Sequence, residues 1–227
     1  MLINADFSQM AVVKPNDYQW VKSPRGEVER VMLDRVGDET ARATSLVRYA
    51  PHTIFPEHQH PLGEEILVLS GTFTENNDQH YPAGWYLRNP DGSKHTPSSE
   101  DGTLIFVKLM QMSKTNTETV RINTHYPENW QTLGQRLICP LYLSHDEHTY
   151  LEKLKPHQSF DEHSLNGIEL LIVQGELIAN GECYPTGSWI RLPLQSSHSF
   201  YASEIGAMLY VKTGHLSSAQ KFMEQQS

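Results

Sequence analysis

Short apolar runs separated by turn-forming residues recur along the whole chain. Most runs have the length of a strand, with β-branched residues or alternating apolar and polar positions, as in 64–69 before Gly71. Asn180 and Gly181 lie between two such runs and form the typical sequence of a two-residue hairpin turn. Few segments are both helix-length and amphipathic. The pattern therefore predicts an all-β fold, either a sandwich or a barrel.

The first half of the sequence is repeated in the second half. Each copy contains a Pro-His pair followed by Phe, Glu and His, and later a Tyr-Pro-x-Gly turn. The matching segments are 51–58 with 156–163, 65–71 with 169–175, and 81–84 with 184–187; the matching single residues are Arg88 with Arg191, Pro90 with Pro193, and His95 with His198. The repetition predicts a duplicated domain. We expect an N-terminal domain at 1–111, a linker rich in Ser, Thr and Asn at 112–125, a C-terminal domain at 126–216 and a polar tail at 217–227.

Composition and charge argue against several classes of protein. The net charge is −9 at pH 7, from 18 basic and 27 acidic residues without a Lys/Arg cluster, so we do not expect nucleic-acid binding. No apolar run is long enough to span a membrane, and the N-terminus lacks the pattern of a signal peptide. Cys139 and Cys183 do not form a disulfide framework. We therefore expect a cytoplasmic protein with no membrane partner.

His58, His60, Glu64 and the distant His95 are candidate metal ligands. The rings of His58 and His60 project from the same face of an extended strand, because they are two residues apart. A Pro-Leu-Gly turn lets Glu64 approach them at the start of the next strand, and His95 returns from another strand. A His-x-His pair alone is more often two exposed polar residues. The glutamate and the third histidine at these spacings favour a metal site.

The donor set narrows the choice of metal. Three neutral imidazoles and one carboxylate suit zinc, iron, nickel or manganese. Calcium and magnesium prefer shells made of oxygen alone.

The surrounding residues are similar to those of a known family. The motif His-x-His-x3-Glu-x6-Gly that begins at His58 resembles the first cupin motif, and the turn at 81–84 with His95 resembles the second. The similarity is closer to one branch of the cupins, the cupin domain of the ChrR anti-sigma factors, over residues 20–110. The segments that resemble it are 45–51, 60–71, 81–84 and 95–98.

This resemblance implies a fold, a cofactor and an assembly. In the ChrR family the matching residues hold zinc in a jelly-roll barrel, which implies a zinc, with iron as the alternative, at His58, His60, Glu64 and His95. Together with the repeat, it implies two tandem jelly-roll barrels, a bicupin. Cupins commonly form homodimers, so a homodimer is the expected assembly. Ser99 stands where the second cupin motif usually has asparagine, but this departure removes no ligand.

The second copy keeps only part of the ligand set. His163 and His198 match the first and last histidines of the first copy, whereas Leu165 and Ile168 occupy the positions of the other two ligands. A second metal site would need His163, His198 and a re-aimed Glu169, although strand alternation places Glu169 on the other face. The alternative is a vestigial pocket in which the two histidines form hydrogen bonds.

The resemblance implies a regulatory or sensing protein that responds to an oxidant or a small-molecule ligand. ChrR proteins also carry a helical module that binds the sigma factor and holds its own zinc through a histidine and paired cysteines. That module has no counterpart here, since the first histidine is His52 and the first cysteine is Cys139. A sigma factor is therefore not an expected partner.

Two other functions stay open at this point. ChrR-like cupins also resemble non-haem iron dioxygenases that cleave β-diketones or hydroxyacetophenones, and an octahedral iron on four protein ligands leaves two positions for substrate and oxygen. The third possible function is a ligand-binding or interaction protein whose metal only stabilises the barrel. The fold alone does not decide among the three, because one fold hosts unrelated functions.

Two charged residues near the motif have open roles. Arg88 is repeated as Arg191, which favours a role in the fold over anchoring a substrate. Glu65 could act as a general base only if its side chain turned inward, and alternation disfavours that.

Overall fold

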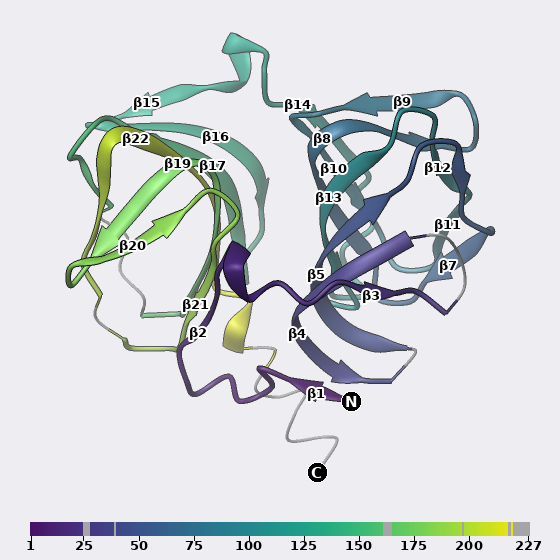
Figure 1. Cartoon of the computed structure of the whole chain (residues 1–227), viewed down its shortest axis with the longest axis horizontal. Helices are drawn as coiled ribbons and strands as arrows, with labels where there is room; N and C mark the ends of the chain where they lie inside the picture. Colours follow the sequence, from purple (N-terminus) through teal and green to yellow (C-terminus); the bar gives the residue numbers. More distant parts are fainter. Residues whose placement is uncertain (25–27, 39, 161–164, 197, 218, 220–227) are drawn as a thin grey trace. The chain divides into compact units, whose positions relative to one another are not determined.

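Antiparallel strands make up almost all the regular structure of the chain, as the sequence predicts. The computed structural model describes residues 1–24, 28–38, 40–160, 165–196, 198–217 and 219. Two units are distinguished, one formed by Met1–Ala5 and Gln19–Tyr126 and the other by Asp6–Tyr18 and Pro127–Ser227 (Figure 1). In the part of the chain that is described, no helix combines the length and apolar character needed to cross a bilayer.

The first unit is a curled antiparallel sheet with the order β1-β4-β5-β13-β8-β10-β14. The strands of this order are β1 (Leu2–Ile3), β4 (Val28–Gly37), β5 (Ala41–Tyr49), β13 (Thr103–Leu109), β8 (Glu64–Glu75), β10 (Trp85–Asn89) and β14 (Val120–Asn123). Shorter strands complete the barrel: β3 (Val21–Lys22), β6 (Thr53–Ile54), β7 (His58–His60), β9 (Gln79–Pro82), β11 (Ser93–His95) and β12 (Pro97–Ser99). Alternate residues of the long strands, including Ile66, Val68, Ile105 and Val107, pack in its interior.

The second unit repeats this architecture with the order β15-β16-β17-β22-β19-β21-β2. Its strands are β2 (Ala11–Val13), β15 (Gln131–Leu133), β16 (Arg136–Leu143), β17 (His148–Leu154), β18 (Ser159–Phe160), β19 (Ile168–Ala179), β20 (Glu182–Pro185), β21 (Trp189–Leu192) and β22 (Phe200–Thr213). The short 3-10 helices η1 (Pro15–Asp17) and η2 (Pro127–Asn129) also belong to this unit. Its interior is a continuous apolar cluster that includes Leu170, Ile190 and Leu209.

The hairpin expected at Asn180 and Gly181 is present. Ala179 pairs with Glu182, and the two residues between them have φ angles of 52° and 79°. Both angles are left-handed, as a type I′ turn requires, and asparagine and glycine tolerate them best.

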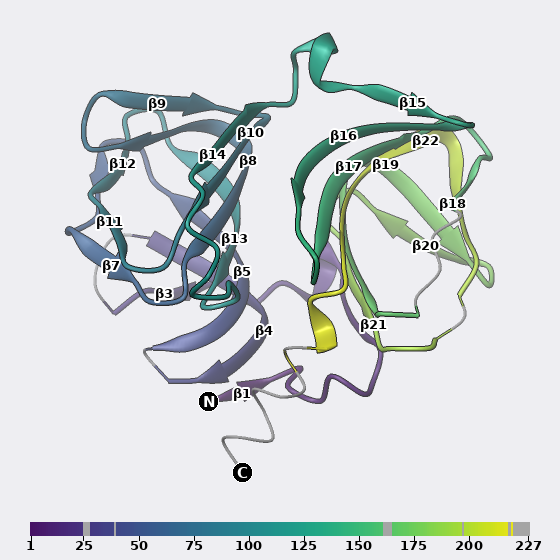
Figure 2. The same cartoon turned by 180° about the vertical axis from the view of Figure 1, so that it is seen from behind.

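Each sheet receives a strand that precedes the other copy of the repeat. In the first unit β14 pairs with β10 (Figure 2). In this pairing Trp85 lies opposite Asn123. In the second unit β2 pairs with β21, the equivalent of β10, so that Val13 faces Trp189. Residues 120–123, which the sequence analysis assigns to the linker, are thus a sheet strand of the first unit.

Two β-bulges in the first unit reverse the alternation of side chains. In β4 the register skips Leu33: Met32 faces Ser45 and Asp34 faces Thr44. In β8 it skips Leu69 in the same way. Beyond each bulge, residues that would point outward in a regular strand point into the barrel.

Candidate metal centre

The two outer histidines of the motif are brought together by one short ladder. Strands β7 and β11 pair antiparallel so that His95 lies directly opposite His58, and their ring centroids are 5.0 Å apart. His60 is on the same face of β7, with its ring centroid 4.6 Å from that of His58 and 4.8 Å from that of His95. The three imidazoles therefore converge, as the spacing of the sequence indicates.

Glu64 completes the convergence from the start of β8. Its Oε2 lies 3.4 Å from Nε2 of His60 and 3.5 Å from Nε2 of His95, and these two nitrogens are 2.9 Å apart. Metal bonds of about 2.1 Å place neighbouring ligand atoms about 3 to 3.5 Å apart. These three atoms stand close to the separations that one transition-metal ion requires, and the donor nitrogens of His58, His60 and His95 lie within 4.8 Å of one another.

Backbone and side-chain acceptors fix the tautomers of two of these histidines. Nδ1 of His58 lies 2.9 Å from the carbonyl oxygen of Pro56, and Nδ1 of His95 lies 2.7 Å from Oε1 of Glu75. Both acceptors take a hydrogen from Nδ1, which leaves the lone pair on Nε2 directed at the cluster. Such outer partners orient the imidazole and increase its basicity as a ligand.

Glu75 is a functional candidate that the sequence analysis missed. It ends β8, eleven positions after Glu64, so simple alternation would place it outside the barrel. The bulge at Leu69 reverses that alternation and brings the Glu75 carboxylate to His95. Glu64, Glu75 and His95 consequently form a second group of converging donor atoms.

Asn89 and Arg121 hold the two carboxylates in place. The Asn89 amide donates to Glu75 at 3.0 Å and to Glu64 at 3.3 Å. Nη2 of Arg121, on β14, donates to Oε2 of Glu75 at 2.8 Å and to Oδ1 of Asn89 at 2.7 Å. The segment expected to be a linker thus supplies the cation that neutralises Glu75.

Burial and charge act differently on the three titratable groups. Burial lowers the pKa of His60. Burial would also lower the pKa of His95, but Glu64 and Glu75 outweigh it and raise that pKa. For Glu75, burial is outweighed by the hydrogen bond from His95 and the charge of Arg121, which lower its pKa. Glu75 therefore stays ionised near neutral pH.

Metal affinity should decrease as the pH is lowered, because protons compete with the metal for the ligand nitrogens. The raised pKa of His95 makes this loss begin at a higher pH than an ordinary histidine would give. Below that pKa we expect zinc affinity to fall about tenfold per pH unit, as measured by chelator competition. The folding stability of the metal-free protein depends on pH in the opposite direction. The raised pKa of His95 stabilises the fold below the unfolded pKa of 6.5, and this stability is lost as pH rises through the folded pKa.

Replacing Glu75 by glutamine tests its role as the orienting partner of His95. The amide keeps the volume but removes the charge that holds the imidazole, so we expect zinc affinity to fall about 10- to 100-fold. Titration with a competing chelator measures the loss. The exposed Glu57→Gln variant removes the same charge near His58 and should keep the original affinity. Equal affinities for both variants would contradict the role.

Arg88 and Glu65 lie on the outer face of the sheet, not in the barrel. Nη1 of Arg88 donates to Oε2 of Glu65 at 3.2 Å, and both residues are buried. A substrate-anchoring Arg88 is therefore wrong, because strand alternation and this ion pair turn it away from the site. Glu65 likewise does not face the site, so it cannot serve there as a base.

A cavity of about 270 Å³ opens beside the histidine cluster. Three of the four predicted ligands, His58, His60 and Glu64, form part of its wall. A small molecule in this cavity would therefore contact the side of the ligand cluster.

The interior of the second unit is apolar where the first is polar. Glu64 and Glu75, the first and last residues of β8, correspond to Ile168 and Ala179 at the two ends of β19. Leu192 closes β21 at the position of the amide in the first unit, and all three apolar residues belong to the buried core. The second unit thus has apolar residues in place of both carboxylates and of the Asn89 amide that donates to them.

The second candidate site is not assembled as it was predicted. Of its members, His163 lies outside the described residues. Glu169 accepts a hydrogen bond from Nε1 of Trp189 at 2.8 Å and lies 2.8 Å from Nε2 of His215. The residues on either side of Glu169 belong to the interior cluster, so its carboxylate faces away from it.

The remaining member of that candidate site lies apart from the glutamate. The ring of His198 stacks against Phe200, at 6.2 Å between centroids, and Phe200 belongs to the interior cluster. His198 therefore packs beside the interior cluster, whereas the carboxylate of Glu169 faces away from it.

Imidazoles and a carboxylate that converge inside a small antiparallel barrel define a cupin with a candidate site for a divalent metal. The chain belongs to the ChrR cupin-like domain family, whose model matches residues 8–113 and again residues 124–217. The chain is thus a cupin in duplicated form. A comparison with curated proteins finds no relative by sequence.

Solved structures share the fold at low sequence identity. A putative dioxygenase from Nostoc punctiforme has a TM-score of 0.71 at 14% identity and covers 90% of this chain and 82% of its own. The bacterial pirin YhhW from Escherichia coli, in complex with nickel(II), has a TM-score of 0.68 at 11% identity, with coverage of 90% and 98%. An 11S allergen from Cocos nucifera has a TM-score of 0.67 at 10% identity, with coverage of 92% and 90%. Proteins of such different kinds support the fold alone.

Proposed function

We propose that the first unit binds one divalent transition metal through His58, His60, Glu64 and His95, and uses this centre to bind a small molecule. The observation that carries the proposal is the cavity whose wall includes three of these ligands. Zinc suits the donor set best, and iron is the alternative. A protein with this centre would respond to a small ligand or an oxidant as a regulatory or sensing module.

The groups around the cavity favour ligand binding over proton-transfer catalysis. Apart from the proposed ligands, the titratable side chains among the described residues of its wall are Arg30, Arg35 and Tyr49. Burial and the charge of Glu64 raise the pKa of Tyr49, so its hydroxyl stays protonated near neutral pH. None of these groups is suited to act as a general base at that pH.

A non-haem dioxygenase is the second candidate, and the open cavity favours it. When bound, iron would supply the redox chemistry that such a reaction needs. The chain's own contribution would be to position an organic substrate and to exclude water with the apolar wall of the cavity. β-Diketones and hydroxyacetophenones are the substrate classes proposed for this reading.

The metal content of protein purified without chelator or added metal tests both candidates. About one zinc per chain, with no oxygen consumed on a panel of diketones and acetophenones, would support a structural or sensing zinc site and count against the dioxygenase. About one iron, with oxygen uptake on that panel, would support the dioxygenase. Less than about a tenth of an equivalent of any transition metal, even after reconstitution, would overturn the metal centre itself.

A further inference from the structure

Two arginines of one strand face the cavity because of a β-bulge. Arg30 and Arg35 are five residues apart on β4 and would lie on opposite faces of a regular strand. The register skips Leu33, so Arg30 pairs with Val47 and Arg35 pairs with Ala43. Val47 and Ala43 are four apart on β5 and share its inner face, so the two arginines share that face as well. Both line the cavity.

Arg30 is half-buried and Arg35 is buried. Among the described residues, the buried Nε of Arg30 has no hydrogen-bond partner. Arg35 is 4% exposed, and its Nη2 donates to the carbonyl oxygen of Asp38, which is not a charged acceptor. Burial lowers the pKa of Arg35 and the charge of Arg30 lowers it further, and together they outweigh the opposing effect of the Asp38 carboxylate.

Buried cations normally have an anionic partner. The acidic side chain in the described wall of the cavity is Glu64, a proposed metal ligand already held by Asn89. Three neutral imidazoles, one carboxylate and a divalent metal would leave that side of the cavity with a net charge of about +1. Arg30 and Arg35 add to this charge, so the cavity as a whole favours an anion.

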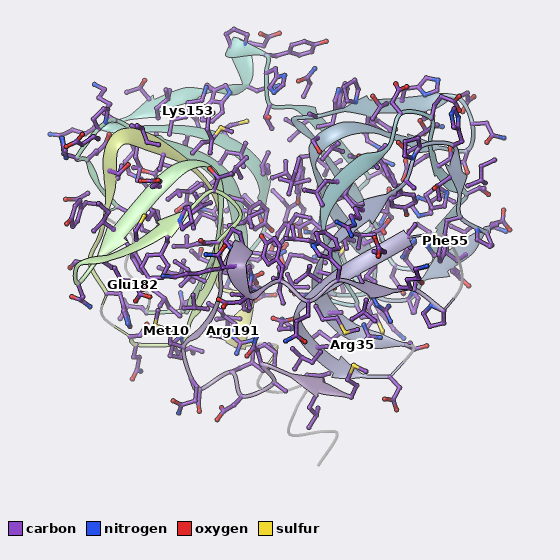
Figure 3. All side chains as sticks on the ribbon, in the orientation of Figure 1. Met10, Arg35, Phe55, Lys153, Glu182 and Arg191 are labelled. Carbon is purple, nitrogen blue, oxygen red and sulfur yellow. The ribbon has the colours of Figure 1, made fainter. Side chains whose placement is uncertain are left out.

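The rest of the wall is apolar and small. Its apolar side chains include Val28, Val47, Phe55, Ile105, Val107 and Leu109. Arg35 and Phe55 of this unit are both labelled in Figure 3, Arg35 on β4 and Phe55 shortly before β7. The volume of about 270 Å³ falls just below the usual range for drug-sized ligands, so a matching molecule has a compact apolar body.

From this geometry we propose that the cavity recognises a small organic carboxylate, with Arg30 and Arg35 binding the carboxylate and the apolar wall covering its body. The inference deepens the proposed function, because it names the class of ligand for the same site. Guanidinium groups bind carboxylates through paired hydrogen bonds, which explains the use of arginine here. A neutral ligand of the same shape would offer the two guanidinium groups no negative charge.

Isothermal titration with benzoate and benzamide tests the charge requirement. The two probes have nearly the same shape and differ by the charge, and both are titrated into metal-loaded and metal-free full-length protein. We expect benzoate to bind at least about tenfold more tightly than benzamide. Equal affinity for the two probes, or no binding of benzoate, would overturn the proposal.

Variants identify the residues responsible. Arg30→Gln and Arg35→Gln should each weaken benzoate binding about 10- to 100-fold, and Arg30→Lys should restore part of it. Arg48→Gln is the matched control: Arg48 lies on β5, is exposed and pairs with Glu29 at 2.7 Å, so its loss should leave benzoate affinity unchanged. Unchanged affinity in both cavity variants would overturn the proposal.

Metal content distinguishes the failure of this inference from the failure of the proposed function. Arg30→Gln should keep the metal content of the original protein, because Arg30 is not a proposed ligand. A protein that binds benzoate through the arginines but never takes up metal would support the anion site and overturn the metal centre. A protein that binds metal but binds benzoate and benzamide equally would support the metal centre and overturn the anion site.

Discussion

Replacing His60 by alanine is expected to weaken metal binding by the chain strongly. His60 is buried, and its Nε2 lies 2.9 Å from that of His95 and 3.4 Å from Oε2 of Glu64, so its loss removes one donor from the middle of the cluster. We expect affinity for zinc to fall by at least about 100-fold, more than for loss of an outer partner. Elemental analysis after dialysis against a weak chelator measures the result.

His80→Ala is the matched control for this experiment. His80 belongs to the same unit but is exposed on β9, where its Nδ1 is 3.0 Å from the Thr74 hydroxyl. Its removal should leave the metal content unchanged. A full equivalent of metal in His60→Ala would show that the assigned ligand set is wrong, and loss in both variants would point to a general effect of removing histidines.

Replacing Gly71 by alanine is expected to destabilise the first barrel strongly. The residue has a φ of +70°, and a Cβ there would collide with the backbone carbonyl oxygen of Gly102. Left-handed backbone and a clash with immovable main chain together should cost about 3 to 5 kcal/mol. Urea unfolding followed by tryptophan fluorescence measures the loss.

Gly181→Ala is the control that measures the cost of the left-handed backbone without a steric clash. Its φ is +79°, but a Cβ there meets nothing within 4 Å. The change should therefore cost only the left-handed penalty of about 1 to 2 kcal/mol. Similar losses at both positions would mean that the close approach at Gly71 is relieved by a shift of the neighbouring strand.

The repeat and the ligand spacing allowed most of the fold and the core of the site to be predicted. Turn sequences such as Asn180 and Gly181 act locally, so their hairpin follows directly from the chain. The convergence of His58 and His95 depends on a ladder that two short strands form, and the cupin motifs were sufficient to anticipate it. Those motifs did not include Glu75, which orients His95, or Arg35, which lines the cavity.

Register explains why these two residues escaped prediction. Alternation assigns every second residue of a strand to one face, but a single skipped residue exchanges the faces for the rest of the strand. The skips at Leu33 and Leu69 moved Arg35 and Glu75 into the barrel. A bulge is decided by the pairing with a neighbouring strand, so one strand read alone does not reveal it.

Arg121 escaped prediction for a different reason. It lies in a polar segment without clear alternation, between two repeats, and was read as part of a linker. Its strand β14 is a short edge strand, and its role depends on β10, whose residues come 32 to 38 positions before their partners in the chain. Glu75 and Arg121 form one ion pair at 2.8 Å, so missing one of them concealed the other.

The exchange of edge strands has a consequence for synthesis on the ribosome. Residues 11–13 leave the ribosome at the very beginning, yet they pair with residues 189–191. At the usual 5 to 20 residues per second, β2 waits roughly 10 to 35 s for its partner strand. The first barrel also cannot close its ion pair to Glu75 until residue 121 has emerged. Translation speed and chaperones that shield an unpaired strand should therefore influence the yield of folded protein.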